Sequence, residues 1–263
     1  MNDRNETPFL SLAILAYNEA ETVERAARLC SHVLETCGRS YELVLVNDGS
    51  TDGTGEIMEG LVKQLPHCRT IHHPLNLGIG MGIRTCYFQT IGQWATWFPA
   101  DLQADPGELS RLLKYLPDCD VLVTYRDARR RREGWFRKLI SSVDRLLVRL
   151  LFGVALRDLH WVRFFHRSVL ERMSLSACSP FVDTEMIVCA RKMGARLAEA
   201  PLDDRPRTSG TAKGATLSNL VRAVNELGTL YLRGVRLIST ERADTSWLPR
   251  AEASGTDGFA QRR

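Results

Sequence analysis

The chain has 263 residues, of which 44% are hydrophobic and 25% are charged, as is ordinary for a globular protein with a buried core. Its formal net charge of +4 is too small to indicate a nucleic-acid partner. No run of about 18 apolar residues occurs, and residues 1–8 lack the apolar core of a signal peptide. The sequence therefore predicts neither a membrane span nor an export signal.

The seven cysteines are scattered, odd in number and never arranged as Cys-x-x-Cys. This pattern is typical of a reduced protein rather than of a disulfide scaffold or a zinc site. We therefore expect a cytoplasmic protein, either soluble or peripheral on the cytoplasmic face of a membrane.

The first half of the chain alternates short apolar runs with amphipathic segments. The predicted strands span 10–15, 42–46, 70–73, 94–98 and 121–125, and the predicted helices span 18–37, 54–65, about 83–91 and a segment from Pro106. Asn18 and Glu21 have the spacing of a capping box at the start of the first helix. This alternation predicts a Rossmann-like α/β fold with a mostly parallel sheet flanked by helices.

The second half is less regular. Helices are predicted at 135–152, 183–193 and 216–238, and strands at 162–165 and 197–202. We expect a single domain over 9–213 that divides near residue 125, between a flexible segment at 1–8 and a C-terminal amphipathic helix at 214–240. The tail at 241–263 is polar and rich in small residues, which predicts disorder.

Polar turns follow three of the predicted strands, at 17–19, 47–52 and 101–103. The carboxyl ends of parallel strands meet at one edge of the sheet, where open α/β folds bind nucleotides. Asp48 precedes its turn, so we expect it to face the crevice and accept hydrogen bonds from a base or ribose. Ser50 or Asp52 is expected to cap the helix that follows.

Asp101 and Gln103 offer a carboxylate and an amide oxygen two residues apart at a strand end. Hard divalent cations prefer oxygen ligands and bind where a diphosphate completes their coordination. These two residues therefore predict a site for Mg²⁺ or Mn²⁺.

The glycines of Gly78-x-Gly80-x-Gly82 have two interpretations. They allow close backbone approach, so the following helix could bind a phosphate or sugar, or the segment could simply pack tightly. Their place after the third strand differs from the dinucleotide fingerprint, which follows the first strand. His72 and His73 are neighbours on a strand and face opposite ways, so we expect structural roles for them rather than a shared metal.

Four motifs together resemble the family-2 inverting glycosyltransferases, and within them the dolichol-phosphate mannose synthase branch, which glycosylates a polyprenyl phosphate. They lie at 15–19 (Leu-Ala-Tyr-Asn-Glu), 46–52 (Val-Asn-Asp-Gly-Ser-Thr-Asp), 76–80 (Asn-x-Gly-x-Gly) and 100–106 (Ala-Asp-Leu-Gln-x-x-Pro). The resemblance covers about residues 9–213. It implies a GT-A fold and a nucleotide-sugar donor.

The resemblance also assigns residues to the donor, with 9–125 as the nucleotide-sugar-binding half and 126–213 as the acceptor half. The implied donor contacts are Ala16, Tyr17, Glu19, Asp48, Gly78, Gly80, Ala100 and Asp101, and the implied metal ligands are Asp101 and Gln103. Pro99 stands where the family usually has an acidic residue, so the site loses one carboxylate. The metal would then bind more weakly, or the diphosphate would depend more on arginine.

On the acceptor side the resemblance implies phosphate contacts for Arg126, Arg137, Ser141, Arg207 and Lys213. Arginine suits this role because its planar fork stays charged and binds phosphate bidentately. Asp158 with Arg163 resembles an acidic turn followed by a Gly-Phe-Arg-like run, although Val162 replaces the glycine.

Asp183 and Glu185 lie near the start of a predicted helix, where relatives with hydroxyl acceptors carry their base. Either residue is thus a catalytic candidate beside Asp101, and Asp183 is also a plausible helix cap. A phosphate acceptor needs no strong base, because its second pKa is about 6.

The segment 135–152 has an apolar stripe flanked by basic residues, which is typical of a helix lying on a membrane surface. Packing against the core is the alternative. The basic run at 126–132 also fits a solvated loop.

Three hypotheses follow. The first is transfer of a hexose from a nucleotide-diphosphate sugar to a polyprenyl phosphate of the dolichyl or undecaprenyl type, at the membrane surface. The second is a glycosyltransferase with a soluble hydroxyl acceptor, in polysaccharide or natural-product synthesis. The third, suggested by Pro99, is an inactive module that only binds nucleotide sugars.

Overall fold

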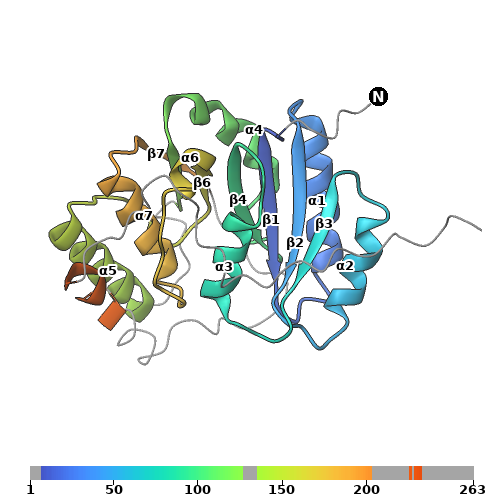
Figure 1. Cartoon of the computed structure of the whole chain (residues 1–263), viewed down its shortest axis with the longest axis horizontal. Coiled ribbons are helices and arrows are strands. Elements are labelled where there is room, and N and C mark those ends of the chain that lie inside the picture. The colour runs from blue at the N-terminus through green and yellow to red at the C-terminus, as the bar shows by residue number, and fades with distance from the viewer. Residues whose placement is uncertain (1–6, 127–134, 203–224, 227, 233–263) are drawn as a thin grey trace, which may run out of the picture.

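A twisted sheet with helices on both faces forms the body of the protein (Figure 1). The computed structural model describes residues 7–126, 135–202, 225–226 and 228–232; between 135 and 144, only the side chains of Ser142 and Val143 are described. The expectations for residues 1–6, the tail at 241–263 and most of the helix at 216–238 lie outside these ranges.

The seven strands have the order β3-β2-β1-β4-β6-β5-β7. They are β1 (Leu10–Ala16), β2 (Tyr41–Asn47), β3 (Cys68–His72), β4 (Trp94–Pro99), β5 (Val121–Tyr125), β6 (Arg163–His166) and β7 (Leu197–Pro201). All pairings are parallel except those of β6, which runs antiparallel to both β4 and β5. The predicted mostly parallel α/β sheet is confirmed.

The helices are mostly short. They are α1 (Val23–Thr36), α2 (Thr54–Val62), α3 (Ile79–Phe88), η1 (Pro106–Glu108), α4 (Leu109–Leu112), η2 (Leu113–Asp118), α5 (Trp135–Phe152), α6 (Arg167–Leu170) and α7 (Val182–Lys192). One core cluster joins the sheet to α1, α2 and α4, and the other joins it to α3, α5 and α7. Leu230, from the described part of the C-terminal segment, packs into the second cluster.

The inner strand β1 is an almost unbroken apolar run, and six of its seven residues are buried. A parallel strand covered on both faces has this composition, because both sets of alternating side chains enter a core. Its neighbours β2 and β4 lie on opposite sides, so the chain order changes direction beside β1. Ligands of open α/β folds bind at the carboxyl edge of such a switch point.

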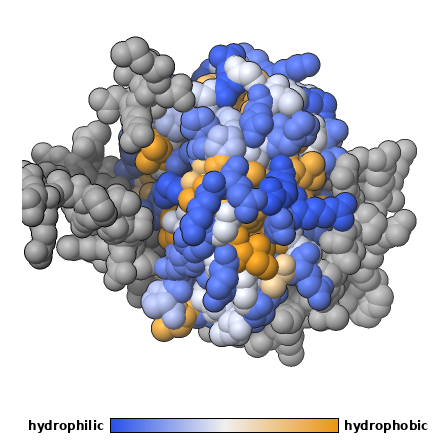
Figure 2. All heavy atoms as spheres, turned by 90° about the vertical axis from the view of Figure 1, so that its right-hand side faces the viewer, coloured by the Kyte–Doolittle hydropathy of each residue, from blue (hydrophilic) through white to orange (hydrophobic). Residues whose placement is uncertain are grey.

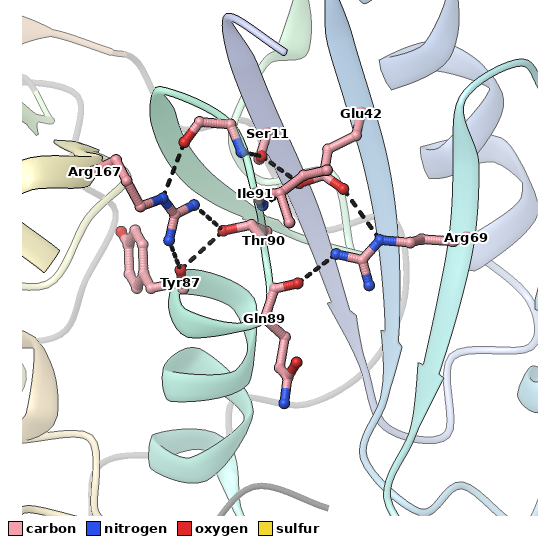
Figure 3. Close-up of polar contacts among 9 residues, drawn as sticks. Ser11, Glu42, Arg69, Tyr87, Gln89, Thr90, Ile91 and Arg167 are labelled. Carbon is pink, nitrogen blue, oxygen red and sulfur yellow. Dashed lines mark hydrogen bonds and ion pairs between the residues drawn. The ribbon is translucent and has the colours of Figure 1, made fainter. Parts of the chain in front are cut away.

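At the opposite, amino edge of the sheet, Glu42 holds the turn that leads into β4 (Figure 3). Its carboxylate accepts hydrogen bonds from the Ser11 hydroxyl and from the backbone N–H of Ile91, at 2.6 Å. It also pairs with Arg69 Nε at 3.1 Å, and Arg69 donates in turn to the Gln89 carbonyl.

Arg167 holds the same turn from the side of β6 (Figure 3). Its guanidinium donates to the carbonyls of Gly92 and Tyr87, at 3.1 and 3.2 Å, and to the Thr90 hydroxyl at 3.0 Å. Burial lowers the pKa of Arg167 from its usual value. The two arginines satisfy carbonyls in the last turn of α3 and just beyond it, which fixes that helix against the sheet.

A charged side chain lies beside the edge strand β3. Glu59 of α2 accepts from Thr70 at 2.6 Å and contacts His72 Nε2 at 2.8 Å, so a charged side chain lies along the strand. The face seen from this side is mostly hydrophilic, with a hydrophobic patch between hydrophilic side chains (Figure 2). Charge on an edge strand discourages edge-to-edge association.

Three local predictions were wrong. The helix after the glycine segment begins at Ile79, so it includes Gly80 and Gly82. The segment from Pro106 is not one helix but η1, the four-residue α4 and η2. The first helix begins at Val23, not at a capping box on Asn18, because Asn18 has a positive φ of 53° and binds another turn.

All seven cysteines are unpaired, as their spacing predicted. Within the described ranges no helix combines the length and the hydropathy needed to cross a bilayer.

Candidate active site

The turns after β1 and β2 are bound to each other. The Asn18 N–H donates to the Ser50 hydroxyl at 2.9 Å, and Asn18 Oδ1 accepts from the Thr51 N–H at 2.9 Å. The positive φ of Asn18 lets its short side chain make this reciprocal contact. Tyr17, between the two turns and the sheet, remains 42% exposed, so its ring is accessible to a ligand.

Asp52 joins the same two turns from the start of α2. It accepts from the Ala20 N–H at 3.1 Å and from the N–H of Thr54, the first residue of α2, at 3.1 Å. The N-cap of that helix is Gly53, so neither Ser50 nor Asp52 is the predicted cap. The Thr54 hydroxyl accepts from the Glu19 N–H at 2.9 Å. Glu19 accepts in turn from the Thr22 hydroxyl at 2.6 Å. The predicted donor turn is thus a preorganised loop pair.

Asp48 has a different environment from the one predicted. Its side chain is only 4% exposed and does not lie open to the crevice. It accepts from the backbone N–H groups of Leu77 at 3.0 Å and Gly78 at 3.1 Å, and contacts His73 Nδ1 at 2.7 Å. Asp48 therefore holds the two residues that precede α3, while no side chain caps the helix itself, so a donor phosphate at this N-terminus stays a prediction.

The glycine segment also serves packing. A Cβ on Gly80 would lie 2.3 Å from the carbonyl oxygen of Cys178, and one on Gly82 would lie 2.6 Å from the Leu15 side chain. Gly78 has a φ of +87°, which favours glycine because other side chains are strained there. Of the two interpretations left open by the sequence, the structure supports tight packing at Gly80 and Gly82.

Asp101 lies just beyond β4, at the switch point. Pro99 pairs with Leu15 of β1, and the Ala100 N–H donates to the Leu15 carbonyl at 3.3 Å. Asp101 is half-buried, and its Oδ1 accepts from the Gln103 N–H at 3.1 Å through a turn in which Leu102 has a φ of +56°. The turn therefore begins beside the end of β1, which Ala16 and Tyr17 follow in the chain.

These residues fit a hard cation that takes most of its ligands from elsewhere. In the part of the chain that the structure describes, no three His, Cys, Asp or Glu residues cluster as a metal site. Asp101 and Gln103 supply oxygen donors only, and Mg²⁺ commonly binds through one or two carboxylates, substrate phosphates and waters. Asp101 and Gln103 would hold such an ion against a diphosphate.

The acceptor half contributes Arg126 at the end of β5. Arg126 Nε lies 2.8 Å from Asp158 Oδ2, and Nη2 lies 3.3 Å from Asp158 Oδ1, a bidentate pair. The guanidinium also stacks on Trp161, 4.8 Å from the ring centroid. Sequence reasoning did not single out Trp161, because nothing in its spacing indicates a stacking partner.

Asp183 forms a buried ion pair with Arg163, whose side chain is fully buried, at 2.5 Å between Oδ1 and Nη1. Burial raises the pKa of Asp183, while Arg163 and His160 act to lower it. The helix begins at Val182 with Phe181 as its N-cap, so Asp183 is not the predicted cap.

Glu185 is also engaged inside the protein. Its carboxylate accepts from the Ser176 N–H and hydroxyl, at 2.9 and 2.7 Å, and from the Ala177 N–H at 2.8 Å. It is 2% exposed. These contacts anchor the 176–180 loop, which packs on Gly80, rather than aim a base at the crevice.

Four predicted acceptor residues are not placed by these contacts. Arg137 and Ser141 belong to the helical backbone of α5, but their side chains lie outside the described part. Arg207 and Lys213 lie entirely outside it.

Comparison with known proteins places this geometry in context. The glycosyl transferase family 2 model matches residues 11–174, more than half of the chain. Glycosyltransferase AglD of Haloferax volcanii is 31% identical over 244 residues, covering 85% of this chain but 36% of AglD. The undecaprenyl-phosphate 4-deoxy-4-formamido-L-arabinose transferase of Edwardsiella ictaluri is 28% identical over 234 residues, covering 87% of this chain and 70% of that protein.

The fold also matches solved structures. Glucosyl-3-phosphoglycerate synthase of Mycobacterium tuberculosis, with Mn²⁺, UDP and phosphoglyceric acid, superposes with a TM-score of 0.65 at 17% identity. The match covers 87% of this chain and 79% of that one. Another complex of the synthase, with Mg²⁺ and UDP, gives a TM-score of 0.64 over 84% of this chain and 79% of that one, also at 17% identity. At this identity the likeness establishes the GT-A-type fold.

Proposed function

Because the chain belongs to glycosyl transferase family 2, we propose that it transfers a hexose with inversion from a nucleotide-diphosphate sugar to a polyprenyl phosphate at a membrane surface. The chain spans about a third of AglD, so the activity of the whole protein is part of the proposal. The undecaprenyl-phosphate substrate in the name of the other relative supports the lipid acceptor.

The contacts made by the acidic residues on the acceptor side support a phosphate acceptor over a hydroxyl acceptor. Asp158 pairs with Arg126, and Asp183 pairs with Arg163. The Glu185 carboxylate accepts hydrogen bonds from the backbone N–H groups of Ser176 and Ala177. A hydroxyl nucleophile needs a base within hydrogen-bond reach, whereas a phosphate monoester is already ionised near neutral pH. The engagement of these three carboxylates therefore favours a phosphate nucleophile.

In this proposal the donor lies across the switch point. The base and ribose are bound near Ala16, Tyr17 and Glu19, and the diphosphate lies beside Ala100, Asp101 and Gln103. Asp101 and Gln103 would hold a divalent cation there, and such an ion would supply charge neutralisation for the departing diphosphate. Arg207 and Lys213 are proposed to bind the same diphosphate.

The acceptor phosphate is proposed to approach from the side of β5 and β6. Asp158 and Trp161 fix the plane of the Arg126 guanidinium before the acceptor arrives. A preoriented arginine loses little conformational entropy when it binds phosphate, which favours the positioning that the reaction requires. Arg137 and Ser141 are proposed as further contacts to the acceptor phosphate.

The exposed side of α5 is the proposed membrane contact. Val148 is fully buried in the core, whereas Leu146 is 55% and Leu150 is 72% exposed, with Arg145 and Arg149 beside them. Apolar side chains flanked by arginine fit the interface of an anionic bilayer. The apolar stripe thus divides between core packing and an exposed face.

The decisive experiment supplies purified protein with a panel of nucleotide sugars and either a short polyprenyl phosphate or soluble hydroxyl acceptors. Transfer to the lipid phosphate is expected, and Arg126→Ala should reduce kcat/KM at least about a hundredfold while donor binding is kept. Arg111→Ala, an arginine paired with Glu108 on the surface, is the matched control. Transfer to a hydroxyl without any lipid, or full activity of Arg126→Ala, would refute the assignment.

Membrane contact is tested separately by flotation with anionic vesicles. Leu146→Glu with Leu150→Glu should abolish binding, whereas Tyr115→Glu should not, because Tyr115 is exposed on η2, over the other face of the sheet. Unchanged flotation of the double variant would exclude α5 as the membrane contact.

A further inference from the structure

The carboxylate of Asp48 is directed into the protein and holds the segment that enters α3. It accepts from the N–H groups of Leu77 and Gly78, the residues just before Ile79 at the start of the helix. Gly49, next along the chain, packs so closely on this segment that a Cβ would lie 2.2 Å from the Leu75 carbonyl carbon. The segment 74–78 is therefore shaped by the turn after β2.

His73 connects this carboxylate to α3. Its side chain is fully buried, with Nδ1 2.7 Å from Asp48 Oδ1 and Nε2 2.9 Å from the Thr85 hydroxyl. An ionised carboxylate can only accept hydrogen bonds, so Nδ1 must carry a proton. The Thr85 hydroxyl can then donate to Nε2 of a neutral ring, which satisfies all three groups.

The contacts among His73, Asp48 and the Leu77–Gly78 turn adjoin the proposed donor site. The Asp48 N–H donates to the Ala16 carbonyl at 2.9 Å, so Asp48 directly adjoins the turn that begins with Tyr17. The held segment joins the end of β3 to the start of α3, so it lies at the same carboxyl edge, where Leu75 is 59% and Ile79 is 50% exposed. A shift of the segment would change the shape of the donor site without removing any proposed contact.

We infer that His73 is a positioning residue for the donor: through Asp48 it fixes the Leu77–Gly78 turn and so preorganises the rim against which the nucleotide binds. This inference rests on the proposed function for its donor. It gives Asp48 a supporting role beside the direct contact with the base or ribose that the sequence predicted. Preorganisation raises affinity by removing the cost of ordering a loop on binding.

Three substitutions at residue 73 separate the Asp48 contact from burial alone. Asn offers an amide N–H near the place of Nδ1, Gln offers a polar group near the place of Nε2, and Leu offers neither. His73→Asn should keep donor affinity within about threefold, whereas His73→Leu and His73→Gln should each weaken it about tenfold. Thr85→Val is the matched control, since it removes only the contact to Nε2.

Calorimetry with nucleoside diphosphates measures the donor affinity of each variant, and steady-state kinetics measure its donor KM and kcat. The loss should appear in Kd and in the donor KM, with kcat changed less than about twofold, because the reacting groups are untouched. A fall in kcat at unchanged KM would overturn the inference, as would equal donor affinity in all three variants or equal losses in His73→Asn and His73→Gln.

Hydrogen exchange distinguishes failure of this inference from failure of the proposed function. The Leu77 and Gly78 amides should exchange at least about tenfold faster in His73→Leu than in His73→Asn, with or without a donor. If that difference is seen but the wild type binds no nucleotide sugar, the proposed function fails and the Asp48 contact stands. If the wild type binds a donor but the amides exchange equally in both variants, the positioning role is overturned.

Discussion

Arg163 of β6 and Asp183 of α7 form an ion pair at 2.5 Å in which the arginine side chain is fully buried and the aspartate side chain is 8% exposed. Within the described residues, none of the three guanidinium nitrogens of Arg163 has a hydrogen-bond partner, so its charge depends on Asp183 for compensation. The pair joins the antiparallel strand to the helix that carries both predicted base candidates.

Removing one partner of this pair should destabilise the protein. Arg163→Met leaves Asp183 buried without its cation and should cost about 3 kcal/mol at neutral pH, whereas the double variant Arg163→Met, Asp183→Asn should recover much of this. Urea denaturation measures both. A single variant as stable as the wild type would contradict the dependence of the two charges on each other.

The same variant should acquire a characteristic pH dependence. Burial raises the pKa of Asp183, so the folded state favours its protonated form. For such an acid, stability is greatest below the ordinary Asp value of about 3.9 and falls as pH rises through the higher folded value. Arg163→Met should steepen that fall, because it removes an opposing cation, and Arg163→Met, Asp183→Asn should flatten it.

Asp52 should show the opposite sign. Burial acts to raise its pKa, but hydrogen bonds from Thr54 and Ala20 outweigh burial, so the pKa lies below its usual value. The stability that Asp52 contributes is therefore complete above about pH 4 and is lost as pH falls through the lower folded value. Asp52→Asn should cost no more than about 0.5 kcal/mol at pH 7, because Asn accepts nearly as well at a helix start and Asp52 is exposed, and almost nothing at low pH. Equal costs at both pH values would refute this account.

Gly80 and Gly60 form a matched pair for packing. A Cβ on Gly80 would meet the Cys178 carbonyl, whereas one on Gly60, in α2, would meet nothing within 4 Å. Gly80→Ala should therefore destabilise the protein by about 1–3 kcal/mol, and Gly60→Ala should stabilise it by up to about 1 kcal/mol. Thermal unfolding of the two variants checks the contrast. A neutral Gly80→Ala would show that the 176–180 loop yields easily.

Substitution of Glu185 tests whether this residue acts as a catalytic base or only anchors the 176–180 loop. If Glu185 only anchors the loop, Glu185→Gln should lower stability by about 2 kcal/mol, through a mismatched amide, and reduce kcat less than about tenfold. Loss of a catalytic base would cost about a hundredfold or more. The kcat is compared well below the unfolding temperature, with Ser176→Ala as the control for loop loosening.

Removal of divalent cations tests how strongly transfer depends on a metal at a site where Pro99 replaces an acidic residue. EDTA should suppress transfer, and added Mn²⁺ should restore it, with a higher metal requirement in Gln103→Ala and little recovery in Asp101→Asn. Full transfer in EDTA would show that basic residues alone neutralise the diphosphate.

The sequence by itself determined the fold class and predicted the location of the site. Alternating apolar runs and amphipathic helices indicated a parallel sheet, and polar residues after 16, 47 and 100 marked its carboxyl edge. These signals are local, because strand burial and turn chemistry depend on neighbouring residues. The same pattern could not show that β6 runs antiparallel, since strand direction depends on how a longer connection returns to the sheet.

Only the tertiary structure decided what each acidic side chain does. The His73 imidazole and the Leu77 and Gly78 amides that surround Asp48 lie 25 to 30 residues away in the chain. The groups that bind Glu185 belong to a loop without a recognisable motif. The cation beside Asp183 is Arg163, which follows Val162 at the position where the resembled motif has a glycine. A carboxylate is a ligand, a base or a support according to the donors around it, and packing brings those donors together.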